Sequence, residues 1–159
     1  MAVSLTYAAN LTAVETLTGN TDDAADANRK VTHAAFDLSG TLSATTSPAV
    51  SLHAGFTLAL VAGAKTIDLT NLLGTNGATV NGTGLKVQFL RVKNTGANAM
   101  TFATGASSGY NFGGPVTVQP GGFAMIGGNN GLPAIAAGVK NIDVSGTGTQ
   151  TAQVTVEMG

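Results

Sequence analysis

Apolar and polar residues alternate with a period of two in most segments of this chain that have a regular pattern. Near the C-terminus, Ala152, Val154 and Val156 share one parity, and the residues between them are polar. Because successive side chains of a β-strand point to opposite faces, this pattern predicts a strand with one buried and one solvated face. The same pattern predicts strands over residues 32–38 and 52–60.

Further segments are predicted to be short strands separated by turns. They are residues 4–8, 11–17, 65–72, 85–93, 99–103, 116–119, 123–126 and 139–144. In residues 85–93 the apolar parity changes between Phe89 and Leu90, which predicts a bulge or burial on both faces. Asn-Gly pairs at residues 76–77 and 81–82 supply the positive φ that tight turns need. About ten short strands and no long helical period predict an all-β fold, either a single-domain β-sandwich or a barrel.

Residues 22–30 depart from the alternating pattern and hold five of the charged residues of the chain. Thr21 can cap the start of a helix, aspartates follow it, and Arg29 and Lys30 come at the end, an order that complements the helix dipole. A short helix and a solvated loop are equally consistent with this segment. We therefore expect an N-terminal arm over residues 1–20, a helix or charged loop over residues 21–30, and a β-sandwich domain over residues 31–159.

Charged residues are scarce, at 9% of the chain against about 25% in typical domains. Seven basic and eight acidic residues give no basic field, so binding to nucleic acid is not expected. The absence of cysteine excludes disulfides and cysteine-ligated metal sites. The most apolar stretch, residues 49–64, is too short to span a membrane, and no basic and apolar leader opens the chain. We therefore expect a soluble protein that is made in the cytoplasm and does not bind a membrane.

No motif in the sequence predicts catalysis, a cofactor or a metal site. Residues 105–109 match the G-x-S-x-G string around a nucleophilic Ser107, but no helical pattern follows it and both histidines precede it. Residues 63–66 lack a glycine of the phosphate-binding loop, and residues 22–33 lack the glycine and glutamate of an EF-hand. Both histidines fall on polar parities and are predicted to lie at the surface or in an interface. We therefore expect no enzyme activity and no cofactor.

Two pairs of residues are candidates for contacts between subunits. Arg91 and Lys93 form a basic strand, for which a salt-bridge or interface role is expected. Tyr110 and Phe112 alternate in a glycine-rich stretch, and they are predicted either to anchor an interface or to fill the mouth of a barrel. A surface this poor in charge suits close contacts with neighbouring subunits, because desolvating charge is costly. Uncharged sheet edges otherwise aggregate, so a closed homo-oligomer is expected.

Three runs of residues, 85–96, 100–102 and 116–122, combine strands and turns in a rhythm that resembles small virion proteins of tailed bacteriophages. Together with the opening at residues 1–3, they are similar to capsid decoration, or cement, proteins. The resemblance implies a jelly roll or a related β-sandwich. It implies as well a homo-oligomer, often a trimer, that binds the major capsid protein on the outer surface of the virion and performs no chemistry. It also implies that the N-terminal arm reaches onto a neighbour, with Tyr7 and Leu11 as expected contacts.

A second interpretation of the sequence is a β-sandwich module of a fibre or adhesin that binds a glycan or a host receptor. Carbohydrate sites usually present exposed aromatic platforms. This chain has two tyrosines, six phenylalanines and no tryptophan. Its aromatic content therefore favours the structural role over the binding module.

Overall fold

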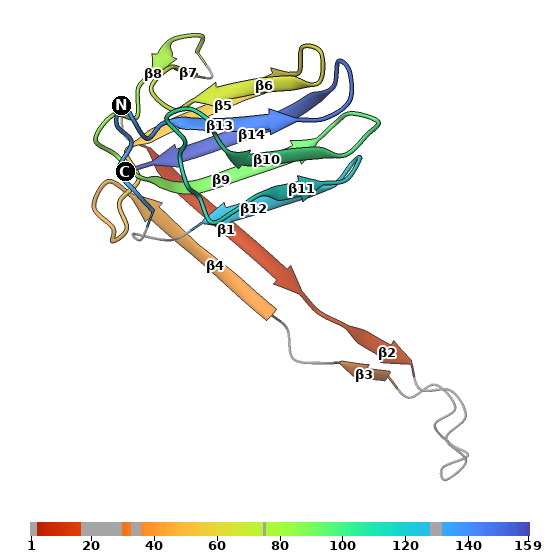
Figure 1. Cartoon of the computed structure of the whole chain (residues 1–159). Coiled ribbons are helices and arrows are strands. Elements are labelled where there is room, and N and C mark those ends of the chain that lie inside the picture. Colours follow the sequence, from red (N-terminus) through yellow and green to blue (C-terminus); the bar gives the residue numbers. More distant parts are fainter. Residues whose placement is uncertain (1–2, 17–29, 33–35, 75, 128–131) are drawn as a thin grey trace, which may run out of the picture. The chain divides into compact units, whose positions relative to one another are not determined.

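The computed structural model describes residues 3–16, 30–32, 36–74, 76–127 and 132–159 (Figure 1). These residues form fourteen strands and no helix, which confirms the prediction of an all-β fold. The chain divides into two compact units. The smaller unit is Thr6–Thr41, and the larger unit combines Met1–Leu5 with Leu42–Gly159.

The larger unit contains two four-stranded antiparallel sheets, and the predicted β-sandwich is therefore confirmed (Figure 1). The first sheet has the order β12-β9-β14-β5 and consists of β5 (Leu52–Ala59), β9 (Val87–Asn94), β12 (Phe123–Gly127) and β14 (Thr151–Met158). The second has the order β11-β10-β13-β6 and consists of β6 (Ala64–Asp68), β10 (Met100–Thr104), β11 (Val116–Val118) and β13 (Asn141–Ser145). A short hairpin of β7 (Leu72–Leu73) and β8 (Thr79–Val80) connects β6 to β9.

The strand pairs of the two sheets are nested along the chain. β5 pairs with β14, β6 with β13, β9 with β12 and β10 with β11, each time antiparallel. The chain changes sheet several times, first between β5 and β6 and last, in the opposite direction, between β13 and β14. These two crossings lie side by side, because the amide of Gly63 donates to the carbonyl of Gly148 at 2.8 Å and the amide of Gly146 donates to the carbonyl of Gly63 at 2.8 Å.

An apolar core fills the space between the two sheets, and the alternating residues of the sequence supply it. Ala152, Val154 and Val156 of β14 are buried, as the pattern predicted, and so are Ala54 and Leu58 of β5. Each large aliphatic side chain in such a core contributes about 1.5–3 kcal/mol through removal from water. The largest fully buried side chains are Tyr110, Phe102, Leu60, Leu69, Leu90, Met100, Ile135, Ile142 and Met158.

The smaller unit contains one complete strand pair and most of a second, of which Ser4, Leu5, Leu42 and Ser43 belong to the larger unit. β1 (Ser4–Leu11) pairs with β4 (Phe36–Ser43), and β2 (Val14–Thr16) pairs antiparallel with β3 (Lys30–Thr32). The buried core cluster contains no described residue of Thr6–Thr41. The helix or loop predicted over residues 21–30 falls, except for Lys30, outside the described residues. Residues 36–41 belong to the smaller unit.

Candidate functional site

Histidine and carboxylate side chains are the groups of this chain that could hold a metal ion. Within the described residues, no three histidine, aspartate or glutamate side chains gather closely enough to hold a metal ion. The same residues contain no helix with the length and hydropathy needed to cross a membrane. His33 lies outside the described residues, so its predicted place at the surface or in an interface stays untested.

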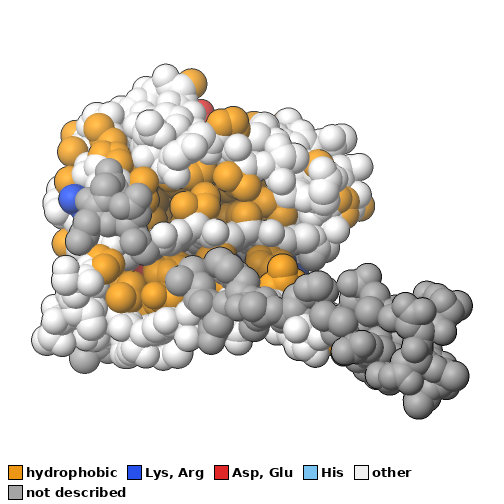
Figure 2. All heavy atoms as spheres, turned by 90° about the horizontal axis from the view of Figure 1, so that it is seen from below, with side chains coloured by type: hydrophobic (Ala, Val, Ile, Leu, Met, Phe, Trp, Pro, Cys, Tyr) orange, Lys and Arg blue, Asp and Glu red, His pale blue; other side chains and the backbone are white. Residues whose placement is uncertain are grey.

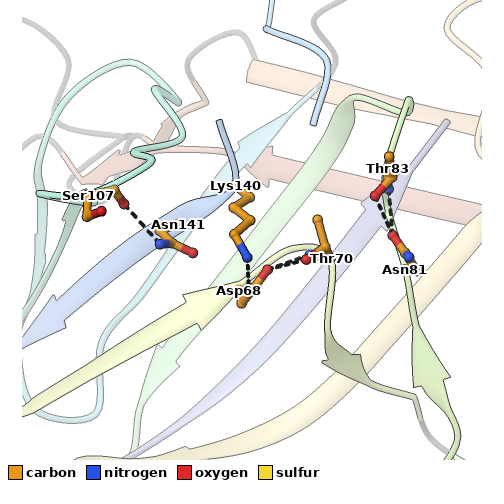
Figure 3. Close-up of polar contacts among 7 residues, drawn as sticks. All are labelled: Asp68, Thr70, Asn81, Thr83, Ser107, Lys140 and Asn141. Carbon is orange, nitrogen blue, oxygen red and sulfur yellow. Dashed lines mark hydrogen bonds and ion pairs between the residues drawn. The ribbon is translucent and has the colours of Figure 1, made fainter. Parts of the chain in front are cut away.

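Ser107 lies in a turn that is fixed to the start of β13 (Figure 3). The side-chain amide of Asn141 donates to the carbonyl oxygen of Ser107 at 2.9 Å, and the amide of Gly105 donates to the carbonyl of Asn141 at 2.9 Å. Ser108 has a φ of 50°, in the left-handed region. A nucleophile elbow requires a helix after the serine, whereas β11 is the next regular element here. The described geometry of the G-x-S-x-G string is that of a structural turn.

Asp68 organises a second polar cluster, in which Lys140 and Thr70 surround its carboxylate (Figure 3). The Nζ of Lys140 donates to Oδ2 at 2.6 Å, and the amide and hydroxyl of Thr70 donate to Oδ1 at 2.9 and 2.6 Å. Burial raises the pKa of Asp68, but the hydrogen bonds from Lys140 and Thr70 outweigh it and hold the pKa below its ordinary value. These contacts fix the loop after β6 to the segment before β13.

His53 and Glu157 form a polar pair on neighbouring strands β5 and β14. Nδ1 of His53 lies 2.6 Å from Oε1 of Glu157, whose side chain is 5% exposed. Burial raises the pKa of Glu157, and the hydrogen bond and charge of His53 offset only part of that rise. Oε2 of Glu157 has no hydrogen-bond partner in the described part of the chain. No local sequence signal links two residues so far apart, and the pair was not predicted.

The outer face of the first sheet brings together the two predicted basic residues. Arg91 lies opposite Met125 of β12 and Thr155 of β14, and the next row places Lys93 opposite Phe123 and Gln153. Arg91 is exposed, Lys93 is half-buried, and Phe123 is 70% exposed. A shallow hollow of about 450 Å³ lies on this face, lined by His53, Gly55, Phe56, Thr57, Arg91, Gln153, Val154 and Thr155. We call the surface formed by Arg91, Lys93, Phe123 and Met125 the basic face.

Two of the predicted interface residues are core residues instead. Tyr110 is 0% exposed and Phe112 is 3% exposed. The hydroxyl of Tyr110 accepts a hydrogen bond from the amide of Val87 at 3.1 Å and donates one to the carbonyl of Pro133 at 2.9 Å. Both side chains therefore stabilise the sandwich, and neither offers a surface to a neighbour in this structure.

The other two predicted contacts lie in the smaller unit. Leu11, the last residue of β1, is 71% exposed, and Val14, the first residue of β2, is 56% exposed. Tyr7 is half-buried, and its ring lies across Gly40 of β4, where an added Cβ would come within 2.7 Å of the Tyr7 hydroxyl oxygen. The smaller unit thus presents one exposed aliphatic side chain on each of its two strand pairs, and the buried core cluster contains none of its described residues.

The surface of the molecule is poor in charge. Figure 2 shows a face on which apolar side chains gather in the middle, surrounded by uncharged polar groups, with few acidic or basic side chains. Comparison of the chain with models of protein families, with curated proteins and with solved structures found no match.

Proposed function

We propose that this chain is a structural virion protein that decorates a bacteriophage capsid and stabilises it by bridging neighbouring capsid subunits. The observation that supports this most directly is the smaller unit, in which paired strands leave Leu11 and Val14 exposed. A two-stranded ribbon is marginally stable in water unless its side chains pack against another surface. Such a ribbon is well suited to bind a neighbouring subunit, which supplies the missing surface.

The strand order of the larger unit supports the jelly-roll part of this proposal. A jelly roll is a sandwich of eight strands in two four-stranded sheets, formed by folding a long antiparallel hairpin onto itself. The nested pairs of β5 with β14 and of β10 with β11 are the outermost and innermost pairs of such a hairpin. This arrangement agrees with the fold that the resemblance to decoration proteins implies.

In this proposal, stabilisation comes from many modest contacts. Each interface of standard size buries about 1,200–2,000 Å². A homo-oligomer, for which we propose a trimer, would bind several copies of the major capsid protein on the outer surface of the virion at once. Multivalent attachment turns weak single contacts into strong retention. No catalysis is needed for this role.

The proposal is tested by co-sedimentation of the purified protein with capsids that lack it. The informative variant is Leu11→Asp with Val14→Asp, which places charge on the exposed aliphatic side chains of the smaller unit. Val61→Asp with Leu73→Asp is the matched control, because these residues are equally exposed, at 69% and 55%, on the sandwich. We expect the first variant to lose most of its retention and the control to keep it. Failure of the unmodified protein to sediment with capsids would overturn the proposal.

A glycan-binding role has less support. Among the aromatic side chains whose exposure the structure describes, Phe123 is the one that is largely exposed. A sugar ring usually needs an aromatic platform flanked by polar groups. The basic face offers a single exposed ring, so we do not propose this role.

A further inference from the structure

Two edge strands of the sandwich line one groove. Among the described strands, β5 pairs only with β14 and β6 only with β13, so each is the last strand of its sheet (Figure 1). A groove of about 470 Å³ is lined by residues of β5, β6 and β7. The unpaired backbone of an edge strand can bind a further strand from another chain. This groove is therefore a candidate site for an extended peptide.

Apolar side chains line much of the groove. Leu58, Ile67 and Leu72 are buried aliphatic residues, one from each of the three strands. Among the described residues of the larger unit, three large hydrophobic side chains are exposed, and two of them, Val61 and Leu73, also line the groove. Exposed apolar surface that gathers in one place marks an interaction site. The groove therefore offers apolar contact to aliphatic side chains of a partner.

The backbone of β5 presents hydrogen-bonding groups at the open edge. The amide of Leu60 donates to the carbonyl of Gln150 at 2.8 Å, which continues the register of β5 with β14. In an antiparallel pair, alternate residues of a strand bond to the neighbouring strand. The amide and carbonyl groups of Thr57 and Ala59 therefore point to the open edge, where no described strand pairs with them. An added strand finds donors and acceptors there.

Lys65 adds a positive charge to the groove. It lies opposite Val144 of β13, a core residue, so it belongs to the same row of β6 as the buried Ile67. Lys65 is exposed and has no ion pair with a described residue. Asp68 also lines the groove, but its carboxylate is paired with Lys140. The groove thus has a positive charge that an acidic partner can neutralise.

We propose that this groove binds an extended acidic peptide of another protein. The peptide pairs with β5 as a further strand, inserts aliphatic side chains into the groove and places an acidic side chain beside Lys65. A second copy of β5 fits less well, because Leu52–Ala59 contains no acidic residue, and a lysine at a sheet edge disfavours pairing between copies. This site goes beyond the proposed capsid role and does not depend on it.

The test is a titration of the isotope-labelled full chain with three synthetic peptides, followed by nuclear magnetic resonance. The acidic probe is Thr-Val-Thr-Glu-Thr-Val-Thr with both ends blocked. The basic probe has lysine in place of glutamate. The third probe has proline in place of the threonine after the glutamate, which removes an amide that faces β5 in the added strand.

The expected result is a ranking of the three probes. The acidic probe should shift the amide signals of Thr57 and Ala59. It should bind about five- to tenfold more tightly than the basic probe, since an ion pair at the surface replaces a repulsion. The proline probe should bind about tenfold more weakly than the acidic probe, because it cannot complete the hydrogen bonds to β5.

Variants of the chain locate the contact. Lys65→Glu should reverse the preference between the acidic and basic probes, and Lys65→Gln, which replaces it if it fails to fold by circular dichroism, should remove the preference. Lys93→Glu is the matched control, because it makes the same change of charge on β9, which does not line the groove. Val61→Asp with Leu73→Asp should weaken binding of the acidic probe. The same variant is expected to stay bound to capsids, so the two proposals fail separately.

Four outcomes would overturn the inference. They are a dissociation constant above about 1 mM for all three probes, equal binding of the acidic and proline probes, an unchanged preference in Lys65→Glu, and shifts confined to β12 at the opposite edge of the first sheet. Self-association of the unmodified chain through β5 would also overturn it, because a second copy would then occupy the groove.

Discussion

The imidazole of His53 and the carboxylate of Glu157 face each other across two strands, with 2.6 Å between Nδ1 and Oε1. The two residues are directly paired in the register of β5 and β14. The carboxylate is almost fully buried, whereas the imidazole is about one-third exposed. The pair therefore buries the Glu157 carboxylate, whose charged form is costly to remove from water, in the same sheet that carries the basic face.

This pair predicts how stability depends on pH. Burial raises the pKa of Glu157 above its ordinary value of 4.5, so the folded protein binds this proton more tightly than the unfolded chain. The contribution of Glu157 to stability is therefore full below pH 4.5 and decreases as the pH rises through the raised pKa. Urea denaturation at a series of pH values should detect this decrease in the unmodified protein and not in Glu157→Gln. Identical profiles for the two proteins would contradict the assignment.

Asp68 predicts the opposite dependence. Burial raises its pKa, but the hydrogen bonds from Lys140 and Thr70 dominate and lower it below 3.8, so the folded protein binds this proton less tightly. Its contribution is present above pH 3.8 and is lost as the pH falls through the lowered pKa. Asp68→Asn should therefore lose less stability than the unmodified protein during acid titration. The control is the same acid titration of the stability of Asp143→Asn, a substitution on β13.

Tyr110→Phe should destabilise the sandwich by about 1–3 kcal/mol, because it leaves the amide of Val87 without its acceptor inside the core. Thr101→Val is the matched control, since it removes the hydrogen bond of 2.9 Å to Thr117 at an exposed position. We expect the control to change the free energy of unfolding by less than about 0.5 kcal/mol. Chemical denaturation measures both, and equal effects would show that Tyr110 does not stabilise the core as described.

Gly63→Ala should destabilise the crossing between β5 and β6. Its φ is 81°, and an added Cβ would lie 2.6 Å from the carbonyl oxygen of Gly146 in the adjacent crossing. Gly77 has a similar φ of 78° with nothing within 4 Å of an added Cβ, so Gly77→Ala isolates the conformational cost, about 1 kcal/mol. We expect Gly63→Ala to cost clearly more than that in thermal or chemical denaturation. Equal destabilisation by the two substitutions would contradict a close approach between residue 63 and the carbonyl oxygen of Gly146.

The alternating pattern predicted individual strands but not their partners. The strand predicted over residues 32–38 overlaps β3 and β4, and its partners are β2 and β1 rather than strands of the sandwich. Alternation shows which face of a strand is apolar. It does not identify the strand that pairs with it, because many neighbouring strands can leave the same face buried. The strand predicted over residues 65–72 ends early at Asp68, because its carboxylate holds the amide and hydroxyl of Thr70 in a turn.

The predicted contact residues fall into an exposed and a buried group, and the local pattern could not distinguish the two. Leu11 and Arg91 are exposed, as a contact surface requires, whereas Tyr110 and Phe112 are in the core. Their parity across Asn111 indicated one shared face but not whether that face points inward. The direction is set by the turn at residues 105–109, where the amide of Tyr110 donates to the carbonyl of Asn141 at 2.8 Å. That contact joins residues distant in sequence, and no local pattern signals it.

The most direct test of the central proposal is cryo-electron microscopy of capsids incubated with this protein and of capsids without it. We expect additional density on the outer capsid surface that accommodates the two four-stranded sheets, with the Thr6–Thr41 unit in contact with a neighbouring subunit. Capsids with bound protein should also lose their DNA at a higher temperature than capsids without it. Identical maps, or density confined to the tail, would contradict a role in decorating and stabilising the shell.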